Sequence, residues 1–336
     1  MQLWHPGGAP GGGTSLVYSS SLLGEQRDIG ETAEPVVTQG HSPADTTKLA
    51  GGDVLDHFIV IETLGAGGMG VVVSAYDPDL DRKAAIKVLR DAGAGRNQQQ
   101  RLLREAQAMA KLSHPNVVTI YEVGTVGNQV FLAMEYVEGS TLRGWLVEAE
   151  RSWQEVLTIF VQAAQGLAAA HRSGLVHRDF KPDNVLIDKQ DRAQVADFGL
   201  VGVAGDEDLD SEAVATRGAL SLTLTQTGAR MGTPAYMAPE QHRGEQVDAR
   251  SDQFSFCVSL YEALYGERPF AGESAKEIAA SILEHRLRPR PKNDLPTYVH
   301  AALMRGLLAD PQARWANMEE LLAALEPAPV SSRSPF

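Results

Sequence analysis

HRDFKPDN, residues 177–184, is the stretch that decides how this 336-residue chain is interpreted. Charged surface loops are common, but here Lys181 follows Asp179 by two residues and Asn184 follows it by five. A short apolar segment then leads to the sequence DFG at 197–199. Together these residues offer a base, a cation that can face a phosphate, and two oxygen ligands for Mg²⁺.

Composition and charge narrow the class of protein. A hydrophobic share of 43% with 22% charged residues is ordinary for a soluble globular chain. The net charge of −13 argues against a nucleic-acid partner. No apolar run approaches the roughly 18 residues of a membrane span, and the N-terminus lacks the features of a signal peptide. Cys257, the single cysteine, excludes an internal disulfide. We therefore expect a cytoplasmic protein without a membrane span.

Periodic patterning is confined to the middle of the chain. Residues 1–52 are rich in Gly, Ser, Thr and Pro and predict a disordered N-terminal arm, because they cannot bury enough apolar area to offset the entropy of ordering. This arm is a regulatory tail or an extension without a specific role. The folded domain is expected over 53–327, followed by a flexible C-terminal tail at 328–336.

A glycine-rich segment, GAGGMG at 65–70, lies between two predicted strands at 58–64 and 71–76. A dinucleotide-binding fingerprint needs a helix after the glycines. Here β-branched residues follow directly, which favours a β-hairpin. Backbone N–H groups of such a hairpin can close over phosphates without a Cβ in the way.

Lys87 lies among apolar residues in the next predicted strand, 83–89. In the predicted helix 98–111, Glu105 shares the inward stripe of Leu102, Ala106 and Met109. A carboxylate that points inward needs a partner, and Lys87 is the candidate. The pair either orients phosphates or is a structural salt bridge.

Strands at 117–123 and 129–133 complete the first half, and helices dominate afterwards. The helices are predicted at 154–171, 252–264, 278–287, 298–308 and 318–325. Between 199 and 239 the periodicity disappears, as in functional or mobile loops. This segment holds an acidic cluster at 206–212, whose role stays open, and the alternating threonines Thr223, Thr225 and Thr227.

The motifs, in this order, resemble those of eukaryotic-like (Hanks-type) serine/threonine protein kinases of bacterial style. The resemblance covers about residues 56–327 and rests on GAGGMGVV, AAIK, the Glu105 helix, HRDFKPDN, DFG, GTPAYMAPE, Asp252 and DPQARW. It implies an α+β, two-lobed protein-kinase fold. The N-lobe, 56–137, would be β-rich with one key helix, and the C-lobe, 138–327, would be mainly helical.

The resemblance also implies roles for individual residues. The catalytic residues would be Asp179, Lys181 and Thr233, and the Mg²⁺ ligands Asn184 and Asp197. Nucleotide contacts would come from Leu64, Gly65, Gly67, Gly70, Val72, Ala85, Lys87, Glu105, Met134, Glu135, Val137 and Leu186. Regulatory residues would be Arg178, Thr223, Thr225 and Thr227. Glu240 and Arg314 would form a structural ion pair. Met109, Ile120, His177 and Phe198 would stack as a spine near Asp252.

The implied function is transfer of the ATP γ-phosphoryl group to Ser or Thr hydroxyls of proteins. ATP would be the cosubstrate and Mg²⁺, with Mn²⁺ as an alternative, the metal. Arg178 would meet a phosphorylated loop threonine, through autophosphorylation and a transient self-association. Two other readings stay open. A pseudokinase scaffold would bind partners without catalysis, and a small-molecule phosphotransferase would lack GTPAYMAPE and DPQARW.

Overall fold

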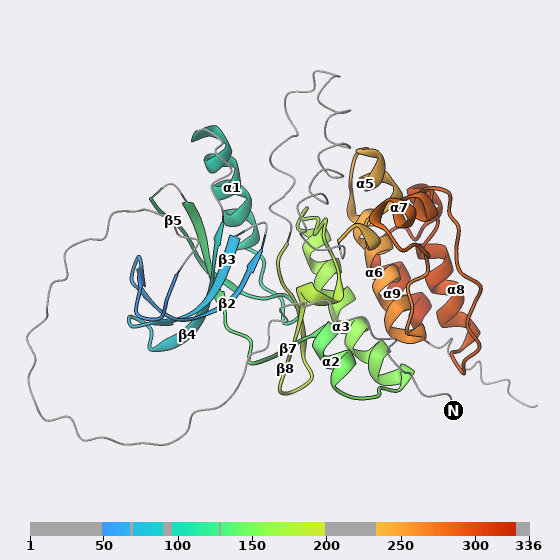
Figure 1. Cartoon of the computed structure of the whole chain (residues 1–336), viewed down its shortest axis with the longest axis horizontal. Coiled ribbons are helices and arrows are strands. Elements are labelled where there is room, and N and C mark those ends of the chain that lie inside the picture. The colour runs from blue at the N-terminus through green and yellow to red at the C-terminus, as the bar shows by residue number, and fades with distance from the viewer. Residues whose placement is uncertain (1–48, 68–69, 90–95, 128, 199–232, 327–336) are drawn as a thin grey trace, which may run out of the picture.

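Two lobes of different secondary structure make up the described chain (Figure 1). The structure is a computed structural model, and it describes residues 49–67, 70–89, 96–127, 129–198 and 233–326. Strands and one helix, α1, form the first lobe, and helices dominate the second. The α+β, two-lobed architecture predicted from the sequence is thereby confirmed.

The N-lobe is an antiparallel sheet with strand order β1-β2-β3-β4-β6-β5, and α1 lies against it. Its elements are β1 Val54–Leu55, β2 Phe58–Gly67, β3 Gly70–Asp77, β4 Arg82–Leu89, α1 Arg96–Met109, β5 Ile120–Val126 and β6 Gln129–Glu135. All strands expected from the alternating pattern are present, with boundaries shifted by up to three residues.

The two faces of this sheet have different neighbours because successive side chains of a strand alternate. On β4, Ala84, Ile86 and Val88 join an apolar core with Phe131 and other residues of the same sheet face. Ala85 and Lys87 point to the other side, where Lys87 is opposite Leu132 and Ala85 is opposite Met134. The alternation therefore delivers Lys87 to the face that looks toward the second lobe.

The C-lobe consists of packed helices and a small three-stranded sheet, β7-β8-β9. Its first elements are β7 Gly139–Thr141, α2 Leu142–Glu148, α3 Trp153–Arg172, η1 Pro182–Asn184, β8 Val185–Asp188 and β9 Ala193–Val195. Its later elements are η3 Thr233–Ala235, α5 Pro239–Arg243, α6 Ala249–Tyr265, α7 Ala275–Leu283, α8 Thr297–Gly306, η4 Pro311–Ala313 and α9 Met318–Leu325.

Helices α3 and α6 form the centre of this lobe. A capping box formed by Ser152 and Glu155 starts α3. Asp248 caps the N-terminus of α6, and Gly266 ends it in the left-handed conformation that glycine adopts without strain. Residues 251–261 of α6 are buried on every side, as the apolar run predicts. The residues 177–184, which follow α3, are therefore held beside two helices that bury many of their side chains.

Three of the differences from the predicted boundaries involve identifiable contacts or backbone conformations. Helix α7 ends at Leu283 rather than at residue 287, because His285 adopts a left-handed φ of 53° and Leu287 pairs with Phe270. Strand β5 begins at Ile120, whereas Val117 bridges to Val195. The turn at 49–52, expected in the arm, contacts β2: Gly52 N–H donates to Val60 O at 2.8 Å, and Thr63 Oγ1 donates to Leu49 O.

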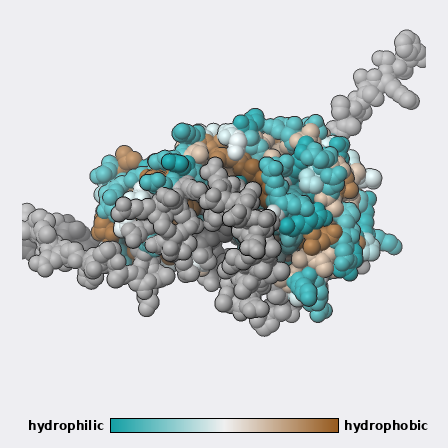
Figure 2. Space-filling model, turned by 90° about the horizontal axis from the view of Figure 1, so that it is seen from above, coloured by the Kyte–Doolittle hydropathy of each residue, from teal (hydrophilic) through white to brown (hydrophobic). Residues whose placement is uncertain are grey.

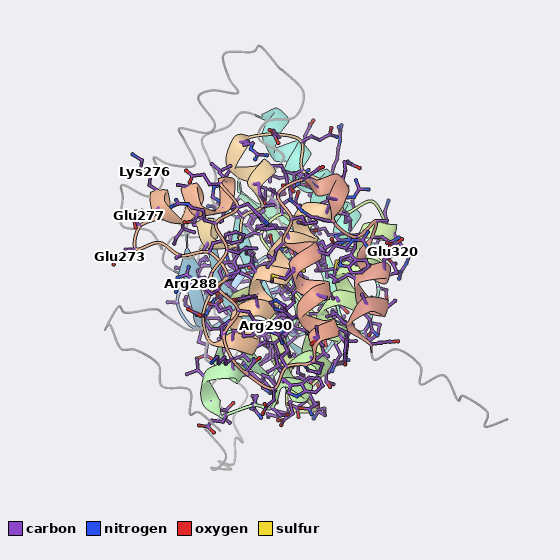
Figure 3. All side chains as sticks on the ribbon, turned by 90° about the vertical axis from the view of Figure 1, so that its right-hand side faces the viewer. Glu273, Lys276, Glu277, Arg288, Arg290 and Glu320 are labelled. Atoms are coloured by element: carbon purple, nitrogen blue, oxygen red, sulfur yellow. The ribbon has the colours of Figure 1, made fainter. Side chains whose placement is uncertain are left out.

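Most of the described residues that are visible in Figure 2 are hydrophilic, with small hydrophobic patches between them. Figure 3 shows Glu273, Lys276 and Glu277 pointing outward at the start of α7, and Glu320 on the exposed side of α9. The opposite sides of these helices bury Ile278, Ile282, Leu321 and Leu325. Among the described residues, none of the helices combines the length and apolar character of a membrane span.

Candidate active site

The loop at 177–184 is held by Asp252, a buried carboxylate at the start of α6. The backbone N–H groups of His177 and Arg178 donate to its two oxygens, each at 2.7 Å. The ring Nε2 of His171, at the end of α3, lies 2.7 Å from the same carboxylate. Arg178 has a left-handed φ of 66°, and Gln241 Nε2 donates to its carbonyl at 2.7 Å. These bonds fix the loop backbone from both sides.

His177 is fully buried and joins the loop to the strand end before Asp197. Asp179 N–H donates to Nδ1 at 3.3 Å, so the ring proton is on Nε2, which donates to Ala196 O at 2.9 Å. The ring also packs against Phe198, with centroids 4.8 Å apart. His177 is therefore a packing and hydrogen-bonding residue, as expected for a member of the spine.

Asp179, Lys181 and Asn184 lie together. Lys181 Nζ is 2.5 Å from Asp179 Oδ2. The amide nitrogen of Asn184 donates to Asp179 O at 2.8 Å and to its Oδ2 at 3.3 Å. Because Nδ2 makes these bonds, Oδ1 is the atom of Asn184 that can accept or bind a cation. The spacing read from the sequence thus becomes one polar cluster.

Asp197 is brought beside Asn184 by the backbone, since Ala196 N–H donates to Asn184 O at 2.9 Å. Asp197 has a left-handed φ of 57°, and its carboxylate lies 3.0 Å from Lys87 Nζ. Burial raises the pKa of the Asp197 carboxyl, but Lys87, assisted by His177 and Lys181, holds that pKa below its ordinary value. The carboxylate is therefore ionised at neutral pH.

The predicted Lys87–Glu105 ion pair is not made in this structure, and this is a correction. Within the described residues, the ion pair of Lys87 goes to Asp197. Ala106 and Met109 of α1 are buried as expected, and Glu105 is half-buried. Two carboxylates, from α1 and from the segment after β9, are candidates for one ammonium group. Sequence periodicity identified the one on α1, whereas contact with the second lobe selected the other.

An apolar cluster lies between the lobes, at the place where the resemblance to protein kinases predicts the adenine ring of ATP. Met134 packs against a set formed by Val118, Val137, Leu186 and Ala196. Behind it is a small pocket lined by Lys87, Met109, Val118, Ile120, Leu132, Met134, Val195, Ala196, Asp197 and Phe198. The predicted contacts Met134, Val137 and Leu186, and the predicted spine residues Met109, Ile120 and Phe198, are thus drawn to the same cleft.

The hairpin of β2 and β3 carries the remaining predicted nucleotide contacts. Leu64, Gly65 and Val72 are half-buried, and Gly65 is opposite Val72. Gly70 has a φ of 148°, and a Cβ there would lie 1.9 Å from Val88 O, so only glycine allows β3 to approach β4 this closely. Val72 is opposite Lys87 on β4. Gly68, Met69 and Gly199 lie outside the described residues.

The linker between the lobes begins at Glu135, whose N–H donates to Thr119 O at 2.8 Å. Its side chain contacts the second lobe: Gln194 Nε2 donates to Glu135 Oε2 at 2.9 Å, and Arg192 Nη2 lies 3.5 Å from Oε1. Val137 is buried. Glu135 thus fixes the linker next to the apolar cluster.

Four predicted residues lie outside the described part of the chain, either whole (Thr223, Thr225 and Thr227) or with the side chain only (Thr233, which begins η3). The acidic cluster at 206–212 lies outside it as well. For Arg178 the structure gives the backbone contacts above. Their assigned roles stay predictions.

Glu240 and Arg314 form the predicted ion pair in the C-lobe. Arg314 Nη1 and Nη2 donate to the two oxygens of Glu240 at 2.7 and 2.8 Å, and Ser251 Oγ donates to Glu240 Oε1 at 2.6 Å. The guanidinium also donates to backbone carbonyls, such as Leu308 O at 2.8 Å. This prediction is confirmed.

A family model described as the protein kinase domain matches residues 58–324. The chain belongs to the protein kinase family. Its fold is similar to the crystal structure of the Mycobacterium tuberculosis PknI kinase domain, with a TM-score of 0.61 and 28% sequence identity over 83% of this chain and 98% of that one.

Bacterial serine/threonine kinases are similar in sequence to this kinase domain. The relatives include the probable serine/threonine-protein kinase SCO3848 of Streptomyces coelicolor, with 36% identity over 78% of this chain and 38% of that protein. PknB of Mycobacterium tuberculosis shares 36% identity over 80% of this chain and 42% of its own length. PrkC of Bacillus subtilis shares 34% over 83% and 42%. The chain thus spans about two fifths of the length of these relatives.

The kinase family implies ATP and a divalent metal, and the residues present fit the metal. Asn184 Oδ1 and the carboxylate of Asp197 are oxygen donors, which Mg²⁺ prefers. The Ala196–Asn184 backbone hydrogen bond brings the two chain segments together. Asp197 is also ionised, as a metal ligand must be.

Several residues that build the kinase site were not found from the sequence. Gln241 and Gln194 carry no motif signal, because a neutral amide in a helix or a strand is common. His171 does carry one: it lies on the apolar stripe of α3, where a polar ring needs a buried partner. That argument leads to Asp252, the acidic residue in the buried helix, 2.7 Å away.

Proposed function

We propose that this chain is a serine/threonine protein kinase that transfers the γ-phosphoryl group of ATP to Ser or Thr hydroxyls of proteins. The observation that supports it is the assembly of Lys87, Asp179, Lys181, Asn184 and Asp197 in one cleft. Phosphoryl transfer depends on positioning and charge neutralisation, and these groups serve both. A scaffold that only binds partners needs none of them.

Each side chain has a distinct task in this proposal. Asp179 accepts a hydrogen bond from the acceptor hydroxyl and orients it, while Lys181, 2.5 Å from Asp179, faces the transferred phosphoryl group. Lys87 binds phosphate oxygens. Asn184 and Asp197 would hold Mg²⁺, which would supply charge neutralisation on the phosphates. Lys181, two residues after the loop aspartate, is the serine/threonine pattern of the family, which favours Ser and Thr over Tyr as acceptors.

The test is transfer of labelled phosphate from ATP to casein, followed by identification of the phosphorylated amino acid. Wild type should label serine or threonine. Asp179→Asn should reduce the rate by about 10²–10⁴-fold, the contribution of a positioned base, while binding of ATP is retained. Asp294→Asn, an exposed aspartate before α8, is the matched control. Retained ATP binding without any transfer by wild type would favour the pseudokinase reading.

We also propose that the kinase phosphorylates its own loop and that Arg178 binds the product phosphate. Thr225 and Thr227, with Thr223 as a further candidate, are the proposed acceptors. This proposal comes from the resemblance, since these threonines lie outside the described residues. Mass spectrometry of freshly purified wild type and Asp179→Asn tests it: loop phosphate should be present in the first and absent in the second. Full activity of Thr225→Ala/Thr227→Ala without loop phosphate would contradict it.

A further inference from the structure

The turn between β1 and β2 places a histidine among carboxylates from separate parts of the N-lobe. Asp56 and His57 are the two loop residues of this hairpin, in which Leu55 pairs with Phe58. Nδ1 of His57 lies 2.9 Å from Asp56 Oδ2, and its Nε2 lies 3.9 Å from Oε2 of Glu122, on β5. One ligand atom from each of Asp56, His57 and Glu122 lies within 4.8 Å of the other two. The three side chains are therefore close enough to meet around one ion.

This cluster bridges the two edges of the N-lobe sheet. In the strand order β1-β2-β3-β4-β6-β5, β1 and β5 are the end strands. A flat sheet of six strands would hold its end strands about 24 Å apart, because neighbouring strands are about 4.8 Å apart. The contact between His57 and Glu122 shows instead that the sheet is curled until two side chains can span its edges. Among the described residues, β1 pairs with β2 and β5 with β6, so strand pairing does not close this seam.

Asp77, the last residue of β3, lies on the other side of the imidazole. Its carboxylate is 2% exposed, accepts from the backbone N–H of Leu80 at 3.2 Å and pairs with Arg82 at 3.1 Å. Its Oδ1 lies 3.8 Å from Nε2 of His57. A carboxylate on the far ring nitrogen commonly orients a histidine that binds a metal. Asp77 therefore favours a ring whose Nε2 is protonated and whose Nδ1 offers its lone pair beside Asp56.

The cluster has more negative than positive charge and is open to water. Three carboxylates surround the imidazole, and one guanidinium, that of Arg82, pairs with the buried one of them. Within the described part of the chain, the ion pairs of Asp56 and Glu122 both go to His57. These side chains are 55%, 41% and 30% exposed, respectively. The negative potential attracts a cation, and the exposure leaves room for the side chains to adjust and for water to complete a coordination shell.

The spacing and the ligand types favour a transition-metal ion. Two ligands bound at about 2.1 Å to one ion are about 3.0 Å apart at a right angle and about 3.4 Å apart at the tetrahedral angle. The 2.9 Å contact between His57 and Asp56 is near this range already. Glu122 has to move inward, which an exposed side chain can do by rotation. An imidazole together with carboxylates suits Zn²⁺, whereas Mg²⁺ prefers oxygen ligands alone.

We propose that Asp56, His57 and Glu122 bind a transition-metal dication of the Zn²⁺ type, which joins the two edges of the curled N-lobe sheet. The ion takes the place of a proton between His57 Nδ1 and Asp56 Oδ2, and water fills the positions that the protein leaves free. The folded chain brings the ligands together from the β1–β2 turn and from β5, so the ion binds the folded state in preference to the unfolded one and stabilises it. The site is separate from Asn184 and Asp197, and it does not depend on the proposed kinase function.

The test measures Zn²⁺ affinity and thermal unfolding of the full chain without ATP. Competition with a chromophoric chelator, in excess Mg²⁺ to occupy sites made of oxygen ligands, gives the affinity. The melting temperature of the wild type should rise with Zn²⁺ and return to its starting value with EDTA. His57→Gln and Glu122→Gln should each weaken Zn²⁺ binding at least about tenfold, the loss expected even for a residue that only orients a ligand, and should abolish the rise in melting temperature. Glu148→Gln, an exposed glutamate at the end of α2, is the matched control.

Two results would overturn the inference. One is a wild type whose melting temperature does not respond to Zn²⁺. The other is an unchanged Zn²⁺ affinity in both His57→Gln and Glu122→Gln, which would assign the binding to another part of the chain. If either variant is unfolded before metal is added, Asp56→Asn replaces it, since this side chain is 55% exposed and the same loss of affinity is expected. Phosphate transfer is not among the readouts, so the outcome is independent of whether the chain is an active kinase.

Discussion

The Glu240–Arg314 pair and the Lys87–Asp197 pair join similar groups in contrasting surroundings. The first lies inside the C-lobe, with side chains 3% and 0% exposed, and the guanidinium also donates to backbone carbonyls. The second lies in the cleft between the lobes, where Asp197 is 36% exposed. Both carboxylates have a pKa below the ordinary value, in each case because the cation outweighs burial.

The difference lies in how many partners each cation has. Groups of the C-lobe alone surround Arg314, so its guanidinium pairs with the carboxylate of Glu240 and with no other carboxylate. Lys87 lies at a boundary between two units, with Glu105 offered by α1 and Asp197 by the segment after β9. A buried and fully bonded pair is part of the fold, whereas a pair in a cleft can change with what binds there.

The largest effect is expected for Arg314→Met. The variant leaves the buried carboxylate of Glu240 without its cation, which costs roughly 3–5 kcal/mol of unfolding free energy. Denaturant unfolding at pH 7 measures this loss. Because the pKa of Glu240 lies below its ordinary value of 4.5 in the wild type, the wild-type advantage is present above that pH and is lost as the pH falls through the lowered pKa. A loss that stayed constant down to pH 3 would contradict this account.

Lys87→Met should act on activity rather than on stability. Loss of one phosphate-binding cation lowers kcat/KM by about 10²–10³-fold. Unfolding free energy should change little, because Asp197 is partly open to water. Phosphate transfer and denaturant unfolding on the same preparation give both numbers, and Lys276→Met, on the exposed side of α7, is the control. If Lys87→Met is as unstable as Arg314→Met, the two ion pairs do not differ in their contribution to stability.

Glu105→Gln probes the exchange of partners directly. Binding of Mg²⁺ and ATP at Asp197 is expected to compete with the Lys87–Asp197 ion pair, so that Lys87 pairs with Glu105 instead. A neutral glutamine at 105 should therefore lower kcat/KM by about tenfold. The melting temperature without nucleotide is measured beside it and reports what Glu105 contributes to the fold, because the ion pair of Lys87 goes to Asp197 in this structure. Full activity of the variant would show that Asp197 remains the partner throughout.

The smallest effect is expected at His57, whose ring extends the comparison to an exposed pair. A hydrogen bond with Asp56 raises the pKa of His57 above 6.5, burial opposes this, and Glu122 and Asp77 raise it further. The stabilisation is therefore complete below pH 6.5 and is lost as the pH rises through the raised pKa. For a side chain 30% exposed it amounts to about 0.5 kcal/mol. His57→Gln should remove this pH dependence of the unfolding free energy, measured by unfolding curves between pH 5 and 8. If the pH dependence of the variant equals that of the wild type, another group is responsible for it.

The strands, the helices and the cluster around Asp179 could be predicted because each is encoded by local spacing. Asp179, Lys181 and Asn184 are brought together by a single short turn, so their distance follows from their positions. The Glu240–Arg314 pair followed from the family resemblance, and the structure confirms it.

Contacts between distant segments were harder to predict. The partner of Lys87 depends on how two lobes meet, and the Arg143–Tyr236 contact spans 93 residues with no pattern in between. The end of α7 was predicted wrongly because a left-handed backbone conformation at a histidine cannot be recognised from the residue type. The cytoplasmic location and the roles of the loop threonines stay predictions.

Gly67 and Gly70 belong to one motif, yet a mutational scan should separate them. Among the described residues, no atom lies within 4 Å of a Cβ built at Gly67, whereas at Gly70 that atom would strike the carbonyl of Val88. In a library selected only for folded protein in cells, position 70 should tolerate glycine alone, whereas position 67 should tolerate many amino acids. Selected for phosphate transfer, both positions should be restricted, so the two screens together distinguish a glycine kept for the chain from one kept for the nucleotide.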